Sequence, residues 1–87
     1  MASLAEGDKH GYAMMEDIAA FAGVKLGPGT LYGAITRLEE NGWIAPVPSD
    51  DRRQPYALTP GGREYLTREL EKLGRVMKTA LSRLRHA

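Results

Sequence analysis

The apolar positions between residues 28 and 41 recur at the spacing of an amphipathic helix. With successive residues about 100° apart, one arc carries the larger apolar side chains, namely Leu31, Ala34, Ile35 and Leu38. Pro28 suits the first helical position, where its missing N–H has no helical partner to lose. Asn41 and Gly42 form a helix-stop signal, because glycine readily adopts the left-handed conformation that ends many helices. We therefore expect a helix over residues 28–41 with this apolar arc buried.

The opposite arc of this helix carries only small or polar residues, namely Gly29, Thr30, Tyr32, Gly33, Thr36 and Arg37. Gly33 lies near the middle of the arc, although glycine inside a helix costs about 1 kcal/mol relative to alanine. Its presence favours close approach of another molecule to the backbone. A DNA major groove, about 12 Å wide, admits a helix and accepts hydrogen bonds from hydroxyl and guanidinium groups. The alternative interpretation is an ordinary solvent-exposed helix face.

A second helical pattern precedes this one, over residues 12–22. Its apolar arc consists of Met15, Ile18, Ala19 and Ala22, widened by Met14 and Phe21. Glu16 and Asp17 are expected to face solvent. The two helices are separated only by residues 23–27, and two short helices joined by a glycine-containing turn form a helix-turn-helix.

The residues after the second helix predict a β-hairpin. Residues 43–48 form an extended segment whose two prolines suit only an edge strand. Residues 49–54 form a polar turn, and residues 55–59 return as a second strand with Tyr56 and Leu58 on one face. Arg52 and Arg53 at the tip are candidate contacts to phosphate or to a minor groove. In the alternative interpretation the tip is a solvated turn in which Asp50 and Asp51 neutralise both arginines.

The C-terminal residues predict one long helix. Thr59 and Pro60 provide the N-cap and the first helical position, and the helical pattern continues to about Arg85. Apolar residues repeat at spacings of three and four, as in the seam between two paired helices; they are Leu66, Leu70, Leu73, Met77, Ala80 and Leu84. The rest of the chain offers little surface to cover so long a seam. We therefore expect it to pair with a second copy and form a homodimer.

Composition and charge narrow the function. The chain has 87 residues, enough for one small core, and a net charge of +1. Residues 1–59 hold five Lys/Arg against eight Asp/Glu (−3), whereas residues 60–87 hold seven against three (+4). Nucleic-acid binding would therefore depend on locally placed arginines and on two copies of the chain, since phosphate neutralisation dominates such affinity. No apolar run of membrane-spanning length and no secretory leader is visible, which predicts a cytoplasmic protein.

The sequence contains none of the usual catalytic constellations. It has no cysteine, only two well-separated histidines, no paired-carboxylate pattern, and no glycine-rich phosphate loop following a strand. His10 and His86 are too isolated to form a metal site. We therefore expect no enzymatic activity, no catalytic residues, no metal site and no cofactor.

Three motifs together resemble the PadR family of bacterial transcriptional regulators. They are Leu26-Gly-Pro-Gly-Thr-Leu-Tyr32, Arg37-Leu-Glu-Glu-Asn-Gly-Trp-Ile44 and Tyr56-Ala-Leu-Thr-Pro-Gly-Gly62, and His10-Gly11-Tyr12 resembles the family's opening of the preceding helix. The resemblance covers residues 4 to about 66. It implies a mainly α winged helix-turn-helix with a small β-hairpin as the wing and a long C-terminal dimerisation helix. Residues 1–59 would form the DNA-binding domain and residues 60–87 the dimerisation helix.

The resemblance also implies a function. Such a protein is a sequence-specific, double-stranded DNA-binding regulator, usually a repressor, that acts as a homodimer. Family contacts carry over to Tyr12, Thr30, Tyr32, Arg37 and Arg53. The chain departs from the family in its short first helix and in Gly33, where relatives often have proline or a larger residue. The C-terminal helix offers only Tyr65 as an aromatic residue, which does not support an effector pocket. The alternative is a winged-helix adaptor that binds proteins and not DNA.

Overall fold

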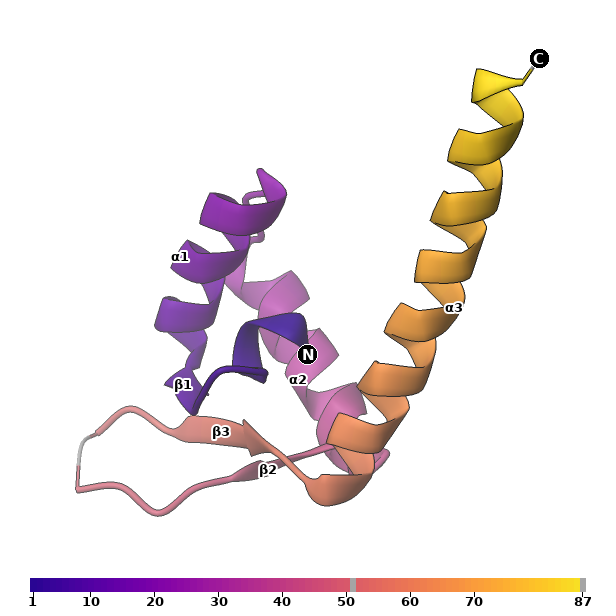
Figure 1. The fold of residues 1–87 in the computed structure, drawn as a ribbon. Coiled ribbons are helices and arrows are strands. Elements are labelled where there is room, and N and C mark those ends of the chain that lie inside the picture. The colour runs from indigo at the N-terminus through magenta and orange to yellow at the C-terminus, as the bar shows by residue number, and fades with distance from the viewer. Residues whose placement is uncertain (51, 87) are drawn as a thin grey trace.

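The computed structural model describes residues 1–50 and 52–86 and contains helices with a small sheet (Figure 1). Asp51 and Ala87 lie outside the described residues, and with Asp51 so does its part in the alternative interpretation, in which it neutralises the wing arginines. In chain order the elements are η1 (Ala2–Leu4, a 3₁₀ turn), β1 (Lys9–His10), α1 (Gly11–Ala22), α2 (Pro28–Glu40), β2 (Ile44–Pro46), β3 (Pro55–Leu58) and α3 (Pro60–Arg85). The mainly α winged-helix fold expected from the sequence is confirmed.

Helix α2 has the ends that its sequence predicts. Pro28 occupies the first turn, and the backbone leaves the helix at Gly42, whose φ of 75° is in the left-handed region. The Trp43 N–H donates to the Leu38 carbonyl and the Gly42 N–H donates to the Glu39 carbonyl, a pattern that satisfies the last helical carbonyls. The chain is thereby turned from α2 directly into β2.

Helix α1 is rotated relative to the sequence expectation. Met14, and not Met15, is its most buried apolar residue, with 5% of its surface exposed. Asp17 does not simply face solvent, because the Ser3 hydroxyl donates to its carboxylate over 2.6 Å. Phe21 does not widen the buried arc, since 58% of its surface is exposed. The N-terminal segment folds back beside Asp17 and accounts for this difference.

Among the described residues the sheet has three strands instead of the expected two. Strand β3 is central, pairing antiparallel with β2 on one side and with β1 on the other. The two residues of β1, Lys9 and His10, lie opposite Tyr56 and Pro55 respectively. Strand β2, which ends at Pro46, lies at an edge, as the two prolines of residues 43–48 predict. The additional strand ties the start of α1 to the base of the wing.

A small apolar core joins the N-terminal turn, both helices and the sheet. Its buried members are Leu4, Met14, Leu31, Ile35 and Ile44. Leu31 and Ile35 are one helical turn apart and each exposes 4% of its surface. Around this core pack further, partly buried side chains that include Leu38, Tyr56 and Leu58. The predicted apolar arc of α2 therefore faces the interior, and Tyr56 and Leu58 share the inner face of β3.

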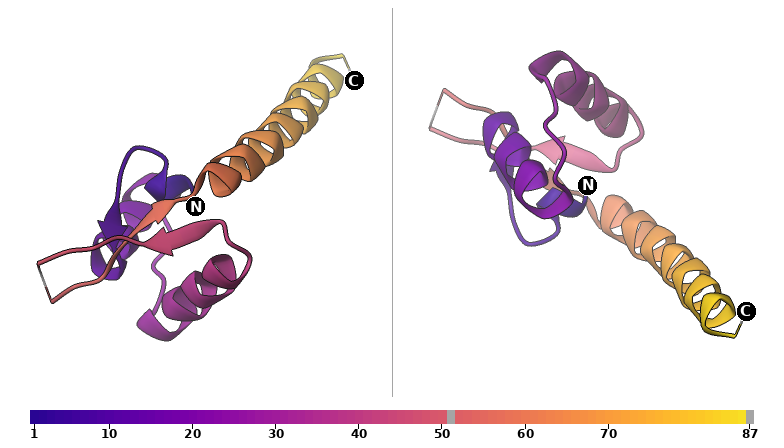
Figure 2. Two further views of the ribbon diagram at one scale, coloured as in Figure 1. Left: turned by 90° about the horizontal axis from the view of Figure 1, so that it is seen from below. Right: turned by 90° about the horizontal axis from the view of Figure 1, so that it is seen from above.

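Helix α3 is attached to the body at its first turns and then projects away from it (Figures 1 and 2). Thr59 caps its N-terminus by accepting a hydrogen bond from the Gly62 N–H, and its own hydroxyl donates to the Gly42 carbonyl. The Trp43 and Tyr65 rings stack with their centroids 3.8 Å apart. Trp43 thus joins α3 to the body, and Tyr65 is used for this attachment.

We predict that Gly62→Ala will destabilise the fold strongly. A Cβ atom at this position would overlap the Trp43 carbonyl oxygen, so the start of α3 would have to move away from Trp43. We expect a loss of about 2 kcal/mol or more in the free energy of unfolding, as for other overpacked sites. Thermal or denaturant unfolding followed by circular dichroism measures this loss.

The matched control is Gly61→Ala, one residue earlier. A Cβ atom there would meet nothing closer than the Thr59 hydroxyl at 3.9 Å, so its unfolding should be nearly unchanged. Equal behaviour of the two variants would contradict the close-contact explanation.

Candidate nucleic-acid interface

The polar face of α2 is exposed along its length. All six predicted residues on it are solvent-exposed: Gly29, Thr30, Tyr32, Gly33, Thr36 and Arg37. Nothing in the described chain would lie within 4 Å of a Cβ atom placed at Gly33. No internal packing contact therefore explains glycine there, and the helix presents a bare stretch of backbone to its surroundings.

Several alternative roles for the side chains on this face are not observed. Thr30 is not a capping residue, because Gly27 is the N-cap and no side chain caps it. Among the described residues no carboxylate forms an ion pair with the Arg37 guanidinium, and Asn41 hydrogen-bonds only the Arg37 backbone carbonyl. Thr36 donates its hydroxyl hydrogen to the Tyr32 carbonyl over 2.9 Å, which leaves its methyl group and oxygen lone pairs exposed.

Four of the nine residues predicted to contact DNA line one hollow beside this face. The hollow has a volume of about 400 Å³ and is lined by Tyr12 of α1, Tyr32 of α2 and both wing arginines, together with His10, Gly11 and Gln54. The other five candidates (Gly29, Thr30, Gly33, Thr36 and Arg37) lie on α2 outside it. Elements far apart in the sequence thus place two phenols and two guanidinium groups around a single depression.

A close contact between the two helices shapes this hollow. A Cβ atom at Gly11 would lie 2.5 Å from the Tyr32 hydroxyl oxygen and 2.8 Å from the adjacent ring carbon. Glycine at this position therefore lets the Tyr32 ring lie against the first turn of α1. The order His10-Gly11-Tyr12 consequently provides a cap, a contact surface and an exposed phenol in three successive residues.

The wing is held in place mainly through Gln54. Its side-chain amide donates to the carbonyls of Val47 and Pro55, at 3.0 and 2.9 Å, and the Val47 N–H donates to the Pro55 carbonyl. These bonds join the two arms of the hairpin next to the tip that carries Arg52 and Arg53. The Arg53 Nη1 atom lies 3.4 Å from the His10 Nε2 atom, which brings the wing against the start of α1.

His10 and Gln54 are site residues that sequence reasoning missed. His10 precedes α1 as its N-cap, and its Nδ1 atom accepts the Ala13 N–H over 3.2 Å. Histidine is not among the residues that usually occupy this position, so the local sequence gave no capping signal. Gln54 resembled any other polar turn residue. The only signal that the sequence offered for either residue was its position just before a predicted element, a helix for His10 and a strand for Gln54.

The phenol beneath the site stays neutral. Burial raises the pKa of Tyr56, and the nearby Glu39 carboxylate raises it further, with a smaller effect of Tyr32. Tyr56 therefore carries no negative charge near neutral pH that would repel an anion at this surface. Tyr56 packs against the apolar core from the central strand β3.

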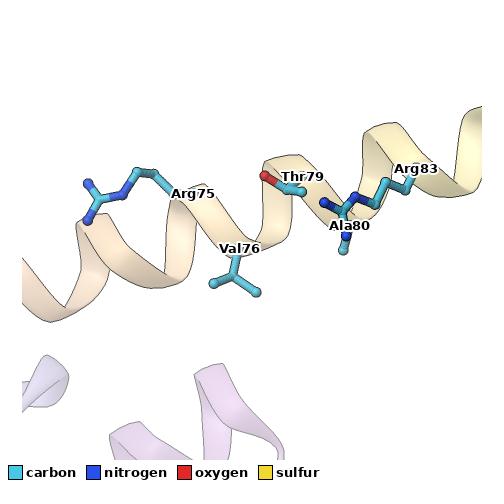
Figure 3. A pocket seen from close by; sticks show the side chains of 5 residues that line it. All are labelled: Arg75, Val76, Thr79, Ala80 and Arg83. Atoms are coloured by element: carbon cyan, nitrogen blue, oxygen red, sulfur yellow. The ribbon is translucent and has the colours of Figure 1, made fainter.

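Neither metal nor membrane chemistry is indicated in the part of the chain that is described. Residues 1–50 and 52–86 contain no cluster of three or more side chains suited to hold a metal ion. Within the same residues no helix is both long and apolar enough to cross a membrane. A second hollow of about 410 Å³ lies along α3 (Figure 3), lined by Arg75, Val76, Thr79, Ala80 and Arg83.

The chain is similar to known transcriptional regulators. A family model described as the PadR-like family of transcriptional regulators matches residues 1–68. A transcriptional regulator of Mycobacterium tuberculosis is 35% identical over 77 residues, covering 82% of this chain and 71% of that protein. An uncharacterised 37.1 kDa protein of a Streptomyces fradiae transposon is 42% identical over 85 residues, covering 93% of this chain. The chain spans only 25% of that protein's length.

Solved structures share the fold over most of the chain. A transcriptional regulator of Clostridium thermocellum superposes with a TM-score of 0.78 at 30% identity, covering 93% of this chain and 82% of that one. Bacillus subtilis PadR, determined in complex with operator DNA, superposes with a TM-score of 0.67 at 20% identity. The latter match covers 79% of this chain and 42% of that chain and supports the fold alone.

Proposed function

The chain belongs to the PadR-like family of transcriptional regulators, and on this basis we propose that it binds double-stranded DNA as a homodimer and represses transcription. Members of this family are regulators, not enzymes, in agreement with the absence of a catalytic constellation in the sequence. The proposal assigns residues 1–59 to DNA binding and residues 60–87 to dimerisation. The Bacillus subtilis relative was solved with operator DNA, which makes a DNA duplex the ligand to test first.

The observation that carries this proposal is the exposed, nearly bare face of α2. A helix that enters a major groove must bring its backbone close to the base edges, which small residues permit. Gly29 and Gly33 lie on that face with open space around both. Arg37, one turn beyond Gly33 and without an ion-pair partner in the described chain, is positioned to contact guanine or a phosphate. Thr30 and Thr36 supply hydroxyl or methyl contacts alongside.

The wing and α1 supply the flanking contacts. Tyr12, Tyr32, Arg52 and Arg53 surround the hollow next to α2 and are suited to bind the sugar-phosphate backbone on one side of the groove. Phosphate contacts of this kind fix the register of a protein on DNA, and contacts to the base edges give the specificity. In this arrangement α2 reads the sequence and the hollow sets its position.

The exposed apolar stripe of α3 supports dimerisation. Leu66 is partly buried by the body, whereas Leu70, Leu73, Met77 and Leu84 expose 51%, 57%, 62% and 74% of their surfaces. Ala80 is exposed on the same stripe, and Val76 and Leu81 widen it. In Figure 3 the Val76 side chain leaves α3 on the side of the body helices. A paired α3 would cover this stripe.

Salt dependence distinguishes DNA binding from a protein-binding adaptor. We expect duplexes taken from the DNA flanking the protein's own gene to bind, with an affinity that falls steeply as salt rises. Three arginines per protomer give a slope of log K against log salt of up to about −5 for the dimer. Fluorescence anisotropy over a salt series measures this slope.

Arg37→Ala should weaken binding of the duplex more than about tenfold, since a guanidinium–base contact is worth about 1–3 kcal/mol. The variant should not have a lower thermal stability.

Gly33→Ala tests the close approach of the α2 backbone. We expect this variant to unfold at a higher temperature, because alanine favours a helix by about 1 kcal/mol and no internal contact opposes it. The same variant should bind the duplex less tightly. Gly74→Ala is the control, since Gly74 also lies inside a helix with open space around it. If Gly33→Ala and Gly74→Ala bound DNA equally well, α2 would not approach the groove at Gly33.

Leu73→Glu tests the dimer seam. A carboxylate at the centre of the apolar stripe would have to be buried without a partner, so we expect a monomer by light scattering. Ser82→Glu adds the same charge on the opposite face of α3 and should leave the dimer intact. A dimeric Leu73→Glu protein would show that the chains associate through another surface.

A further inference from the structure

The two threonines on the exposed face of α2 differ in how their hydroxyl groups are used. The Thr36 hydroxyl donates its hydrogen to the Tyr32 carbonyl, one turn earlier, over 2.9 Å. The Thr30 hydroxyl makes no hydrogen bond with any other group of residues 1–50 and 52–86. Both side chains are exposed to solvent. The two residues therefore offer different groups to a molecule that binds this face.

The bond to the helix backbone removes the Thr36 hydroxyl as a donor. A hydroxyl group has a single hydrogen, and that of Thr36 is already directed at the Tyr32 carbonyl. Phosphate oxygens and the major-groove edge of guanine, with its N7 and O6 atoms, only accept hydrogen bonds. This side chain cannot donate to them unless the internal bond is broken. What Thr36 presents is its methyl group and the remaining lone pairs of its oxygen.

The methyl group is the better placed of these two. The bond to Tyr32 holds the oxygen against the backbone of α2, whereas the methyl group is the other branch of the same carbon atom. Gly33 lies one turn before Thr36, and outside the backbone of α2 nothing in the described chain would lie within 4 Å of a Cβ atom there. The methyl group therefore borders a stretch of bare, uncharged helix. Such a surface suits an apolar group of a partner.

We propose that the Thr36 methyl group recognises the 5-methyl group of a thymine in the major groove. The proposal rests on the DNA binding proposed above and names the base that this residue reads. Thymine is the standard DNA base that carries a methyl group on its major-groove edge, and a threonine methyl is one of the apolar groups that contact it. The contact requires close approach of α2, which the neighbouring Gly33 permits.

The position of Thr36, and not its internal hydrogen bond alone, carries this assignment. Thr67 of α3 makes the same kind of bond, with its hydroxyl 2.8 Å from the Arg63 carbonyl, and is also exposed. A threonine bonded to its own helix in this way is an ordinary feature of a helix surface. Of these two threonines only Thr36 lies on the bare face of α2. Thr67 therefore provides a matched control.

Deoxyuridine removes the proposed partner of Thr36 and nothing else, because uracil pairs as thymine does and lacks only the 5-methyl group. The starting duplex is the one that binds most tightly among those from the DNA flanking the protein's own gene. Each of its thymines is replaced in turn, and the affinity is measured by fluorescence anisotropy. We expect a loss of about fourfold at one thymine for each bound protomer, as for one apolar group of this size returned to water.

Two variants of Thr36 separate its methyl group from its hydroxyl. Thr36→Ser keeps the hydroxyl and loses the methyl group in both protomers, so it should bind the thymine duplex about fifteenfold more weakly, two such losses. It should not distinguish the thymine duplex from the deoxyuridine duplex. Thr36→Val keeps a methyl group and loses the hydroxyl, and it should still prefer the thymine duplex about fourfold. Thr67→Ser should keep both the affinity and the preference of the wild type.

These measurements separate the thymine contact from DNA binding itself. If Thr36→Ser stayed sensitive at every position where the wild type is, or if Thr36→Val lost the preference for thymine, this proposal would be overturned and DNA binding would stand. A wild-type protein indifferent to every single deoxyuridine would have the same consequence. A wild-type protein with no salt-dependent binding to the duplex would overturn both proposals.

The contact can also be observed directly in the wild-type complex. With ¹³C-labelled threonine methyl groups, the Thr36 methyl signal should show a nuclear Overhauser effect to a thymine 5-methyl group, and the Thr67 methyl signal should not. A complex saturated with duplex that lacked this effect at Thr36 would contradict the proposal.

Discussion

The burial of Leu31 and Ile35 determines which face α2 presents to its surroundings. Both side chains belong to the small buried core of the described residues, and each contributes about 1.5–3 kcal/mol by leaving water. Because they lie one turn apart, they fix the rotation of α2 about its axis. Any rotation that turned Gly33 inward would expose one of them. The outward position of Thr30, Gly33 and Arg37 is therefore a consequence of core packing, and the exposed glycine is tolerated because the opposite face stabilises the helix.

Two glycines then set how α2 is joined to the rest of the chain. Gly11 allows the Tyr32 ring to lie on the first turn of α1, and Gly62 allows the start of α3 to lie against the Trp43 carbonyl. Neither has a positive φ, so each is required for close contact and not for backbone conformation. The Trp43–Tyr65 stack adds rigidity to the second joint. The angle between α2 and α3 is thus defined by packed contacts, which in a dimer would define the distance between the two copies of α2.

The parts of the fold that were predictable are those with a local cause. The periodicity of residues 28–41, the proline and glycine signals at helix ends and the apolar repeat of α3 all lie within single elements. Strand β1 has only two residues, too few for any periodicity, and exists because Lys9 and His10 meet β3 from 45 or more positions away. Asp17 faces Ser3 for the same kind of reason. The candidate face of α2 followed from its pattern, whereas the contact of His10 with Arg53 depends on the tertiary fold.

The distribution of charge connects the two proposed roles of the chain. Residues 1–59 carry a net charge of −3, so the body as a whole repels a polyanion and can attract it only where the arginines gather. The proposed interface has three arginines, Arg37 on α2 and Arg52 and Arg53 on the wing, so a single chain would make few phosphate contacts. In the proposed dimer, joining two bodies through α3 would double those contacts and make binding of the second body intramolecular, which would raise the overall affinity without any new interaction. In the proposed dimer the apolar stripe of α3 would therefore allow an otherwise acidic body to bind a duplex, so the proposed DNA binding and the proposed dimerisation depend on each other.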